Sequence, residues 1–142
     1  MSALSGWQNG MSLKDAVNFG WDVAAVDFIP GSQSMENANW HAMRNPRQTP
    51  EEAAREWAKY VQSKLATCEK EDLVLALHAI QNRYSPAHEG FQIWWGPEMT
   101  HWSDELKHIF QQGPWRVSGI RKSANAFRGV IKDWMNNCKC GG

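Results

Sequence analysis

Apolar residues recur with the spacing of an α-helix along most of this chain. The first such stretch begins after Ser12, a good helix cap, and ends at the helix-breaking residues Pro30 and Gly31. Four of its apolar residues fall on one side of a helix: Val17, Trp21, Ala24 and Ala25. The pattern predicts a helix over residues 13–26.

The same spacing predicts four more helices. Thr49, Pro50 and Glu52 are typical of a helix start, because Thr caps the helix, Pro suits its first position and Glu suits its third. The helix at 71–82 carries apolar residues on most sides between Leu73 and Leu77, which indicates a central, buried helix. The expected helices are residues 50–65, 71–82, 101–112 and 118–137.

Two long segments without this periodicity separate the helices, at residues 30–49 and 89–100. Loops of such length inside a compact domain are usually functional. The chain has 142 residues, which suits one domain, and strand signals are scarce. We therefore predict a single all-α, compact multi-helix domain with two long loops.

The charge balance argues against one class of function. Lys plus Arg is 15 and Asp plus Glu is 15, so the formal net charge is zero. Proteins that bind nucleic acid through a strong positive field carry an excess of basic residues. The first residues show no signal-peptide pattern, and no apolar run approaches the roughly 20 residues of a membrane span. We expect the chain as given to be soluble.

Cysteine and tryptophan usage adds two observations. Cys138 and Cys140 are separated by one residue and Cys68 stands alone, a spacing that makes no disulfide framework, so we expect reduced thiols. Nine tryptophans against two tyrosines supply large apolar area. They fit either a packed core or an apolar, interfacial substrate surface.

The candidate chemistry lies in the histidines. His78 and Asn82 are four residues apart in one predicted helix, as are His101 and Glu105 in the next. This spacing brings both side chains of a pair to one helix face, where they can hold one ion. A single such pair is more often a surface or core feature, so the interpretation depends on the combination. Further residues of types that zinc prefers are Asp27, His41 and His88.

The run from Ala76 to His88 resembles the hallmark of the zinc-dependent phospholipase C and single-strand nuclease superfamily. That hallmark is a His, three residues, an Asp, and then a Pro-x-His. Here the pattern is met by His78, Asn82 and Pro86-Ala87-His88. Residue 82 departs from the family, which has Asp at this position.

Flanking residues extend the resemblance to about residues 21–105. The family has a downstream His-x-x-x-Glu or His-x-x-x-Asp, matched by His101 and Glu105, and an upstream Asp followed about fourteen residues later by a His, matched by Asp27 and His41. Residues 85–94 also resemble toxin modules at the C-termini of bacterial Rhs-type polymorphic toxins.

The resemblance implies a zinc phospholipase C-like domain with metal-binding loops and one or two zinc ions. Asp27 would be the general base, or would orient the attacking water, in phosphodiester hydrolysis. The implied ligands of the first zinc are His41, His78 and Asn82, and those of the second are His88, His101 and Glu105. The family's third site needs an N-terminal Trp and an early His, and no His precedes His41. We therefore expect this third site to be lacking here, or its ligands to lie on an upstream segment.

The substrate is open between phospholipid and nucleic acid. The Glu at position 105 and the short gap from His88 to His101 look more like the phospholipase branch. Four aromatic residues between the ligand segments could meet acyl chains or stack bases: Phe91, Trp94, Trp95 and Trp102. We expect a phospholipase C, with a zinc-dependent nuclease as one alternative. The other is a non-catalytic, zinc-stabilised binding module, which Asn82 motivates because a neutral amide replaces a bridging carboxylate. Asn82 could disable this form of the enzyme, in which case Asn82→Asp would raise its activity.

The toxin resemblance has consequences for localisation and partners. Residues 1–142 would form the C-terminal module of a longer protein that is secreted or delivered into a target bacterial cell. Its substrate would be phospholipid at a membrane surface. A cognate immunity protein would protect the producing cell by covering the site, an expectation that rests on analogy.

Overall fold

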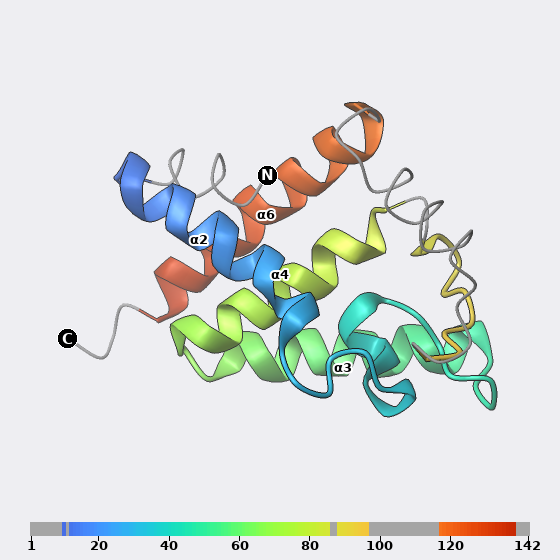
Figure 1. Cartoon of the computed structure of the whole chain (residues 1–142). Coiled ribbons are helices and arrows are strands. Elements are labelled where there is room, and N and C mark those ends of the chain that lie inside the picture. The colour runs from blue at the N-terminus through green and yellow to red at the C-terminus, as the bar shows by residue number, and fades with distance from the viewer. Residues whose placement is uncertain (1–9, 11, 86–87, 97–116, 139–142) are drawn as a thin grey trace.

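The computed structural model describes residues 10, 12–85, 88–96 and 117–138 (Figure 1). These ranges contain two short 3-10 helices, η1 (Val26–Phe28) and η2 (Met35–His41). No strand occurs in them, although Arg44 and Ile93 form an isolated parallel bridge. The all-α prediction is therefore confirmed for this part of the chain. The α-helices are α2 (Leu13–Ala25), α3 (Pro50–Ala66), α4 (Lys70–Arg83) and α6 (Val117–Asn137).

The predicted bounds of these four helices differ from the observed ones by at most one residue at either end. Local side-chain caps explain the agreement at the starts of α2 and α3. Thr49 Oγ1 accepts a hydrogen bond from the Glu52 backbone N–H at 3.2 Å, and the Glu52 carboxylate accepts one from the Thr49 backbone N–H at 2.8 Å. Ser12 Oγ likewise accepts from the Asp15 N–H at 3.1 Å. The helix predicted at 101–112 lies outside the described residues.

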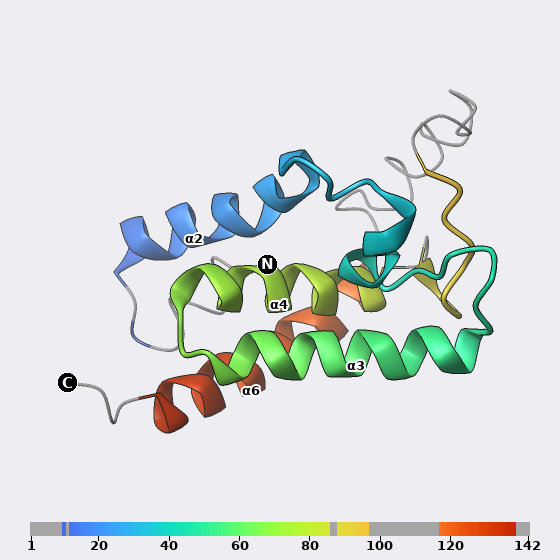
Figure 2. The same ribbon diagram turned by 90° about the horizontal axis from the view of Figure 1, so that it is seen from below.

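Helix α4 lies at the centre of the fold, as its sequence predicts. It packs against α2, α3 and α6, which surround it in the two views of Figures 1 and 2. Apolar side chains from these helices share one core, whose largest fully buried members include Phe19, Leu73, Leu77, Phe127 and Ile131. Because α4 is covered on several sides, two of its polar side chains, His78 and Asn82, are buried too.

Helix α2 turns a different face to the core than the sequence pattern suggested. Val17 and Trp21, on the side with the clearest apolar spacing, are 43% and 72% exposed. The buried side chains are Ala16, Phe19 and Val23. Both sets follow the helical period, and periodicity identifies a face without saying what covers it.

The cysteines also differ from expectation, because Cys68 and Cys138 form a disulfide with a Cα–Cα distance of 5.4 Å. Cys68 lies in the turn between α3 and α4, and Cys138 follows α6. The bond joins residues 70 positions apart, so local spacing gives no hint of it. Our prediction of reduced thiols is wrong for this pair, and Cys140 lies outside the described residues. Among the helices that are described, none is long and apolar enough to cross a membrane.

Candidate metal centre

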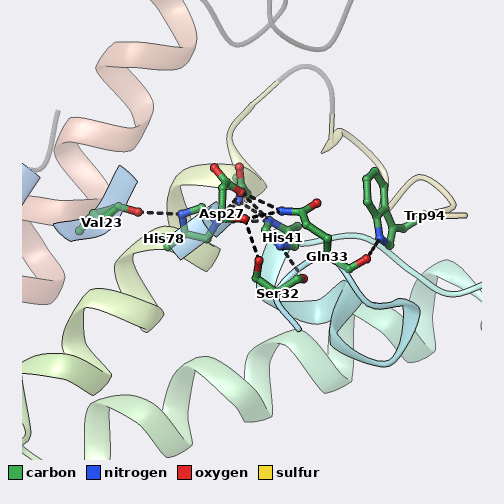
Figure 3. Close-up of polar contacts among 8 residues, drawn as sticks. Val23, Asp27, Ser32, Gln33, His41, His78 and Trp94 are labelled. Carbon is green, nitrogen blue, oxygen red and sulfur yellow. Dashed lines mark hydrogen bonds and ion pairs between the residues drawn. The ribbon is translucent and has the colours of Figure 1, made fainter. Parts of the chain in front are cut away.

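Three potential metal ligands converge where α4 meets η1 and η2. His78 comes from the middle of α4, His41 from the last position of η2, and Asp27 from η1. One ligand atom from each lies within 4.8 Å of the other two. Figure 3 shows the three side chains pointing toward one another. Both histidines are buried, whereas the Asp27 side chain is 45% exposed.

Two backbone carbonyls define which nitrogen of each imidazole is available. His78 Nδ1 lies 3.0 Å from the carbonyl oxygen of Val23, and His41 Nε2 lies 3.0 Å from that of Ser32 (Figure 3). A carbonyl only accepts, so these nitrogens carry the protons and donate. In the neutral imidazoles, His78 Nε2 and His41 Nδ1 are left with lone pairs. Such carbonyl contacts orient histidine ligands in metal sites.

The remaining atoms have the spacing of a tetrahedral site. His78 Nε2 lies 3.2 Å from His41 Nδ1, and Asp27 Oδ1 lies 3.4 Å from His41 Nδ1 and 3.5 Å from His78 Nε2. A tetrahedral zinc ion about 2.0–2.1 Å from each ligand holds the ligand atoms about 3.3–3.4 Å apart. Two lone pairs and a carboxylate oxygen at this distance repel one another unless a cation or proton lies between them.

Asn82 completes the group one helical turn after His78. Its Nδ2 lies 2.8 Å from His78 Nε2 and 3.3 Å from His41 Nδ1, so the amide can donate to these lone pairs. A turn of the amide exchanges Nδ2 for Oδ1 and brings an oxygen ligand to the same place. The structure thus gathers the three residues implied for the first zinc ion together with Asp27.

Asp27 is held in place by the loop that follows it. Its backbone carbonyl accepts hydrogen bonds from Ser32 Oγ at 2.8 Å and from Gln33 Nε2 at 3.1 Å. Burial raises the pKa of the carboxyl. The hydrogen bond with His78 and the positive charges that His78, His41 and His88 carry when protonated outweigh that effect, so the pKa lies below its ordinary value. The carboxylate is therefore the prevailing form at neutral pH.

The residues predicted for a second zinc are only partly described. His88 is buried, with 1% of its surface exposed, and lies near enough to Asp27 to affect its pKa. His101 and Glu105 lie outside the described residues. The second site therefore stays a prediction.

The aromatic residues expected to contact substrate have different environments. Phe91 is buried, stacked edge-on against Trp57 at 6.3 Å between ring centroids, with the Arg83 guanidinium 4.7 Å from its ring. Trp94 is half-buried and donates its indole N–H to the Gln33 carbonyl at 2.8 Å. Trp95 is 48% exposed. Trp102 lies outside the described residues. The Phe91 ring thus lies in the interior, and Trp95 has the most accessible surface of the described three.

Three contributions to the site could not be read from the sequence. The carbonyls of Val23 and Ser32 act through the backbone, which any residue provides. Gln33 links two segments, since its side chain contacts Asp27 and its carbonyl accepts from Trp94 (Figure 3). The one sequence signal was the position of residues 32 and 33 in the long segment before His41.

Comparisons of the chain with protein-family models, with curated proteins and with solved structures found no match.

Proposed function

We propose that this protein is a zinc-dependent phosphodiester hydrolase of the phospholipase C type. The observation that carries the proposal is the convergence of two lone-pair nitrogens and one carboxylate oxygen at 3.2–3.5 Å from one another. The nitrogen and oxygen donors match the ligands that zinc takes in hydrolases. The resemblance of the His78–His88 segment to the zinc phospholipase C superfamily supports the same reaction.

The residues present fit one zinc ion. His41 Nδ1, His78 Nε2 and Asp27 Oδ1 would hold it, with the Asn82 amide oxygen next to them. Zinc, when bound, supplies a Lewis acid for a phosphoryl oxygen and makes water a nucleophile at neutral pH. Sulfur ligands, which are typical of closed structural sites, do not contribute to this group.

Two backbone carbonyls and the Asp27 side chain would have the remaining roles in the reaction. The Val23 and Ser32 carbonyls keep both imidazoles in the tautomers that leave His78 Nε2 and His41 Nδ1 unprotonated toward the site. Asp27 is partly exposed and ionised, so with Oδ1 toward the ion its second carboxylate oxygen would be left to hold or orient a proton at the open side of the cluster. This is compatible with the general-base role that the family resemblance implies for Asp27.

Surface composition favours lipid over nucleic acid as substrate. Phe28, the residue after Asp27, is 87% exposed, and Ile29 is 40% exposed. Apolar side chains beside a polar site suit the boundary between lipid headgroups and acyl chains. The net charge of zero offers little attraction for a polyanion. A zinc-dependent nuclease is the second candidate, supported by the same superfamily resemblance.

A third candidate is a zinc-stabilised binding module without catalysis. Asn82 favours it, because a neutral amide lies within hydrogen-bond distance of both imidazoles at the position where the superfamily that the chain resembles has a carboxylate. A neutral amide lowers the negative charge available to cations. This candidate predicts bound zinc without turnover, including in an Asn82→Asp variant.

Delivery as an antibacterial toxin module, with a cognate immunity protein covering the site, belongs to the same proposal. The Cys68–Cys138 disulfide supports passage through an oxidising compartment, where such bonds form and persist. It is compatible with secretion or with a periplasmic target.

The test is hydrolysis by one zinc-loaded preparation offered either phospholipid or single-stranded nucleic acid. We expect release of diacylglycerol and a phosphorylated headgroup, abolished by a chelator and reduced at least a hundredfold in Asp27→Asn. Gln81→Ala is the matched control, because Gln81 is exposed and precedes Asn82. Cleavage of nucleic acid alone would replace the lipid proposal by the nuclease, and bound zinc with no hydrolysis in the Asn82→Asp variant would favour the binding module.

A further inference from the structure

Helix α2 carries a second apolar face that nothing in the described structure covers. Leu13, Val17 and Trp21 are 67%, 43% and 72% exposed. They are four residues apart, so they lie within about 80° of one another around the helix. The buried residues of α2 lie on another side, toward α4. We refer to Leu13, Val17 and Trp21 as the α2 outer face.

The outer face runs toward the candidate metal centre. Helix α2 passes directly into η1, which contains Asp27 and ends at Phe28, 87% exposed. In Figure 2, α2 forms the upper layer of the molecule, with α4 below it. One continuous element therefore joins the exposed apolar side chains to the half-exposed carboxylate of the site.

The charges of α2 are arranged to suit an anionic surface. Lys14 is exposed and follows Leu13, about 20° around the helix from Trp21. The two acidic residues lie on the far side: Asp22 forms an ion pair with Lys70 of α4 at 3.5 Å, and Asp15 accepts a hydrogen bond from Ser12. The outer face is thus bordered by a cation and free of carboxylates, which complements anionic lipid headgroups.

The size of the face argues against a stable dimer. An aromatic side chain offers roughly 150–250 Å², so Leu13, Val17, Trp21 and Phe28 together expose on the order of 500 Å². A stable protein interface buries about 800 Å² on each partner. Insertion into a bilayer boundary has no such requirement, because a few apolar side chains and one or two cations give reversible binding. Tryptophan is also the residue that most often lies at this boundary.

We propose that the α2 outer face binds a phospholipid bilayer and brings the open side of the metal centre to the headgroups. The inference rests on the proposed function for its purpose, and it deepens that function by naming the surface that meets the lipid. Binding itself needs neither zinc nor hydrolysis.

The test is flotation of the full chain with vesicles of phosphatidylcholine, with and without phosphatidylserine as the anionic lipid. We expect binding that is stronger with phosphatidylserine and weakens as salt is added. The double variant Leu13→Ser and Trp21→Ser should bind at least about tenfold more weakly, because two large side chains lose their apolar burial. Trp21→Phe is the matched control, since it keeps an apolar ring, and should bind within about threefold of the wild type.

Other results would overturn the inference. Wild-type protein that fails to float with either vesicle, or a Leu13→Ser and Trp21→Ser variant that floats as well as wild type, excludes this surface. Sedimentation showing a wild-type dimer that the double variant dissociates, without vesicle binding, assigns the face to a second copy of the chain. Hydrolysis of a soluble short-chain phosphodiester distinguishes the proposed membrane-binding surface from the proposed enzyme activity, because it needs no vesicle. Hydrolysis without vesicle binding contradicts only the surface, and vesicle binding without any hydrolysis contradicts only the proposed enzyme.

Discussion

The two ends of helix α4 meet the rest of the protein in different ways. At its start, Asp72 accepts a hydrogen bond from Lys64 of α3 at 2.8 Å, and Cys68 in the preceding turn is bonded to Cys138. Near its end, α4 buries His78 and Asn82 against His41. The first end is stabilised by an ordinary ion pair and a disulfide. The second end buries imidazole nitrogens that accept hydrogen bonds or bind cations.

The start of α4 therefore has a structural role, whereas the part that carries His78 and Asn82 is suited to bind an ion. An apolar residue at position 78 would pack into the core at no polar cost, as Leu77 and Ile80 do on either side. The histidine instead faces a second imidazole and a carboxylate. Such an arrangement contributes little to the stability of the metal-free protein and becomes favourable when a cation joins the ligands. The predictions below test this contrast, from the largest expected effect to the smallest.

Breaking the Cys68–Cys138 disulfide should give the largest change in the free energy of unfolding. Cys68→Ser should lower the free energy of unfolding by about 4 kcal/mol, because the bond closes a loop of 70 residues in the unfolded chain. Chemical denaturation measures this. Cys138→Ser should lower the free energy of unfolding by the same amount, and the double variant should lower it by no more than either single variant. Additive losses would show that the two cysteines act separately.

Zinc binding near the C-terminal end of α4 should stabilise the folded protein. At a zinc concentration about a hundredfold above the dissociation constant, the wild type should gain about 2.7 kcal/mol in unfolding free energy. His78→Ala should abolish this gain, since it removes one of the three ligands. Gln81→Ala, at an exposed neighbouring position, should keep it. An equal zinc response in His78→Ala would place the metal elsewhere.

Asn82→Asp should strengthen zinc binding tenfold to a hundredfold, about 1.4–2.7 kcal/mol, because it adds a charged ligand to the cluster. The metal-free variant should be less stable than wild type, since a second carboxylate then faces Asp27. Titration calorimetry and denaturation measure the two effects. Gln81→Glu adds the same charge outside the cluster, so an equal gain in affinity there would point to general electrostatics.

The Lys64–Asp72 ion pair should contribute least to the free energy of unfolding. The hydrogen bond from Lys64 leads the effects that hold the Asp72 pKa below its ordinary value, although burial opposes it. The folded state therefore favours the carboxylate. Its contribution is present above the unfolded-state pKa and disappears as the pH falls through the lowered folded-state pKa. Asp72→Asn should cost at most about 1 kcal/mol at pH 7, and wild type and variant should converge in acid. A difference that persists at low pH would contradict this origin.

Much of the fold could be predicted because its signals are local. The caps at Ser12 and Thr49 and the apolar run of α4 act within a few residues. The pairing of His78 with Asn82 follows from one helical turn. The choice of which α2 face meets the core, by contrast, depends on where α4 packs against it.

The rest of the site needed three-dimensional structure. Asp27 and His41 were associated with His78 through a family pattern, not through any local rule. The carbonyls of Val23 and Ser32 that set the imidazole tautomers leave no mark in a sequence. The Cys68–Cys138 bond likewise joins segments that only tertiary packing brings together.

The most direct test of the metal centre is zinc X-ray absorption of the loaded protein, combined with its metal content. We expect zinc bound through the cluster, surrounded by two imidazole nitrogens and at least one oxygen at about 2.0–2.1 Å, with no sulfur at about 2.3 Å. His78→Ala should lose this zinc, while Gln81→Ala should keep it. Absence of bound zinc under zinc-replete conditions, or a sulfur-dominated environment, would contradict the assignment of His41, His78 and Asp27 as a metal centre.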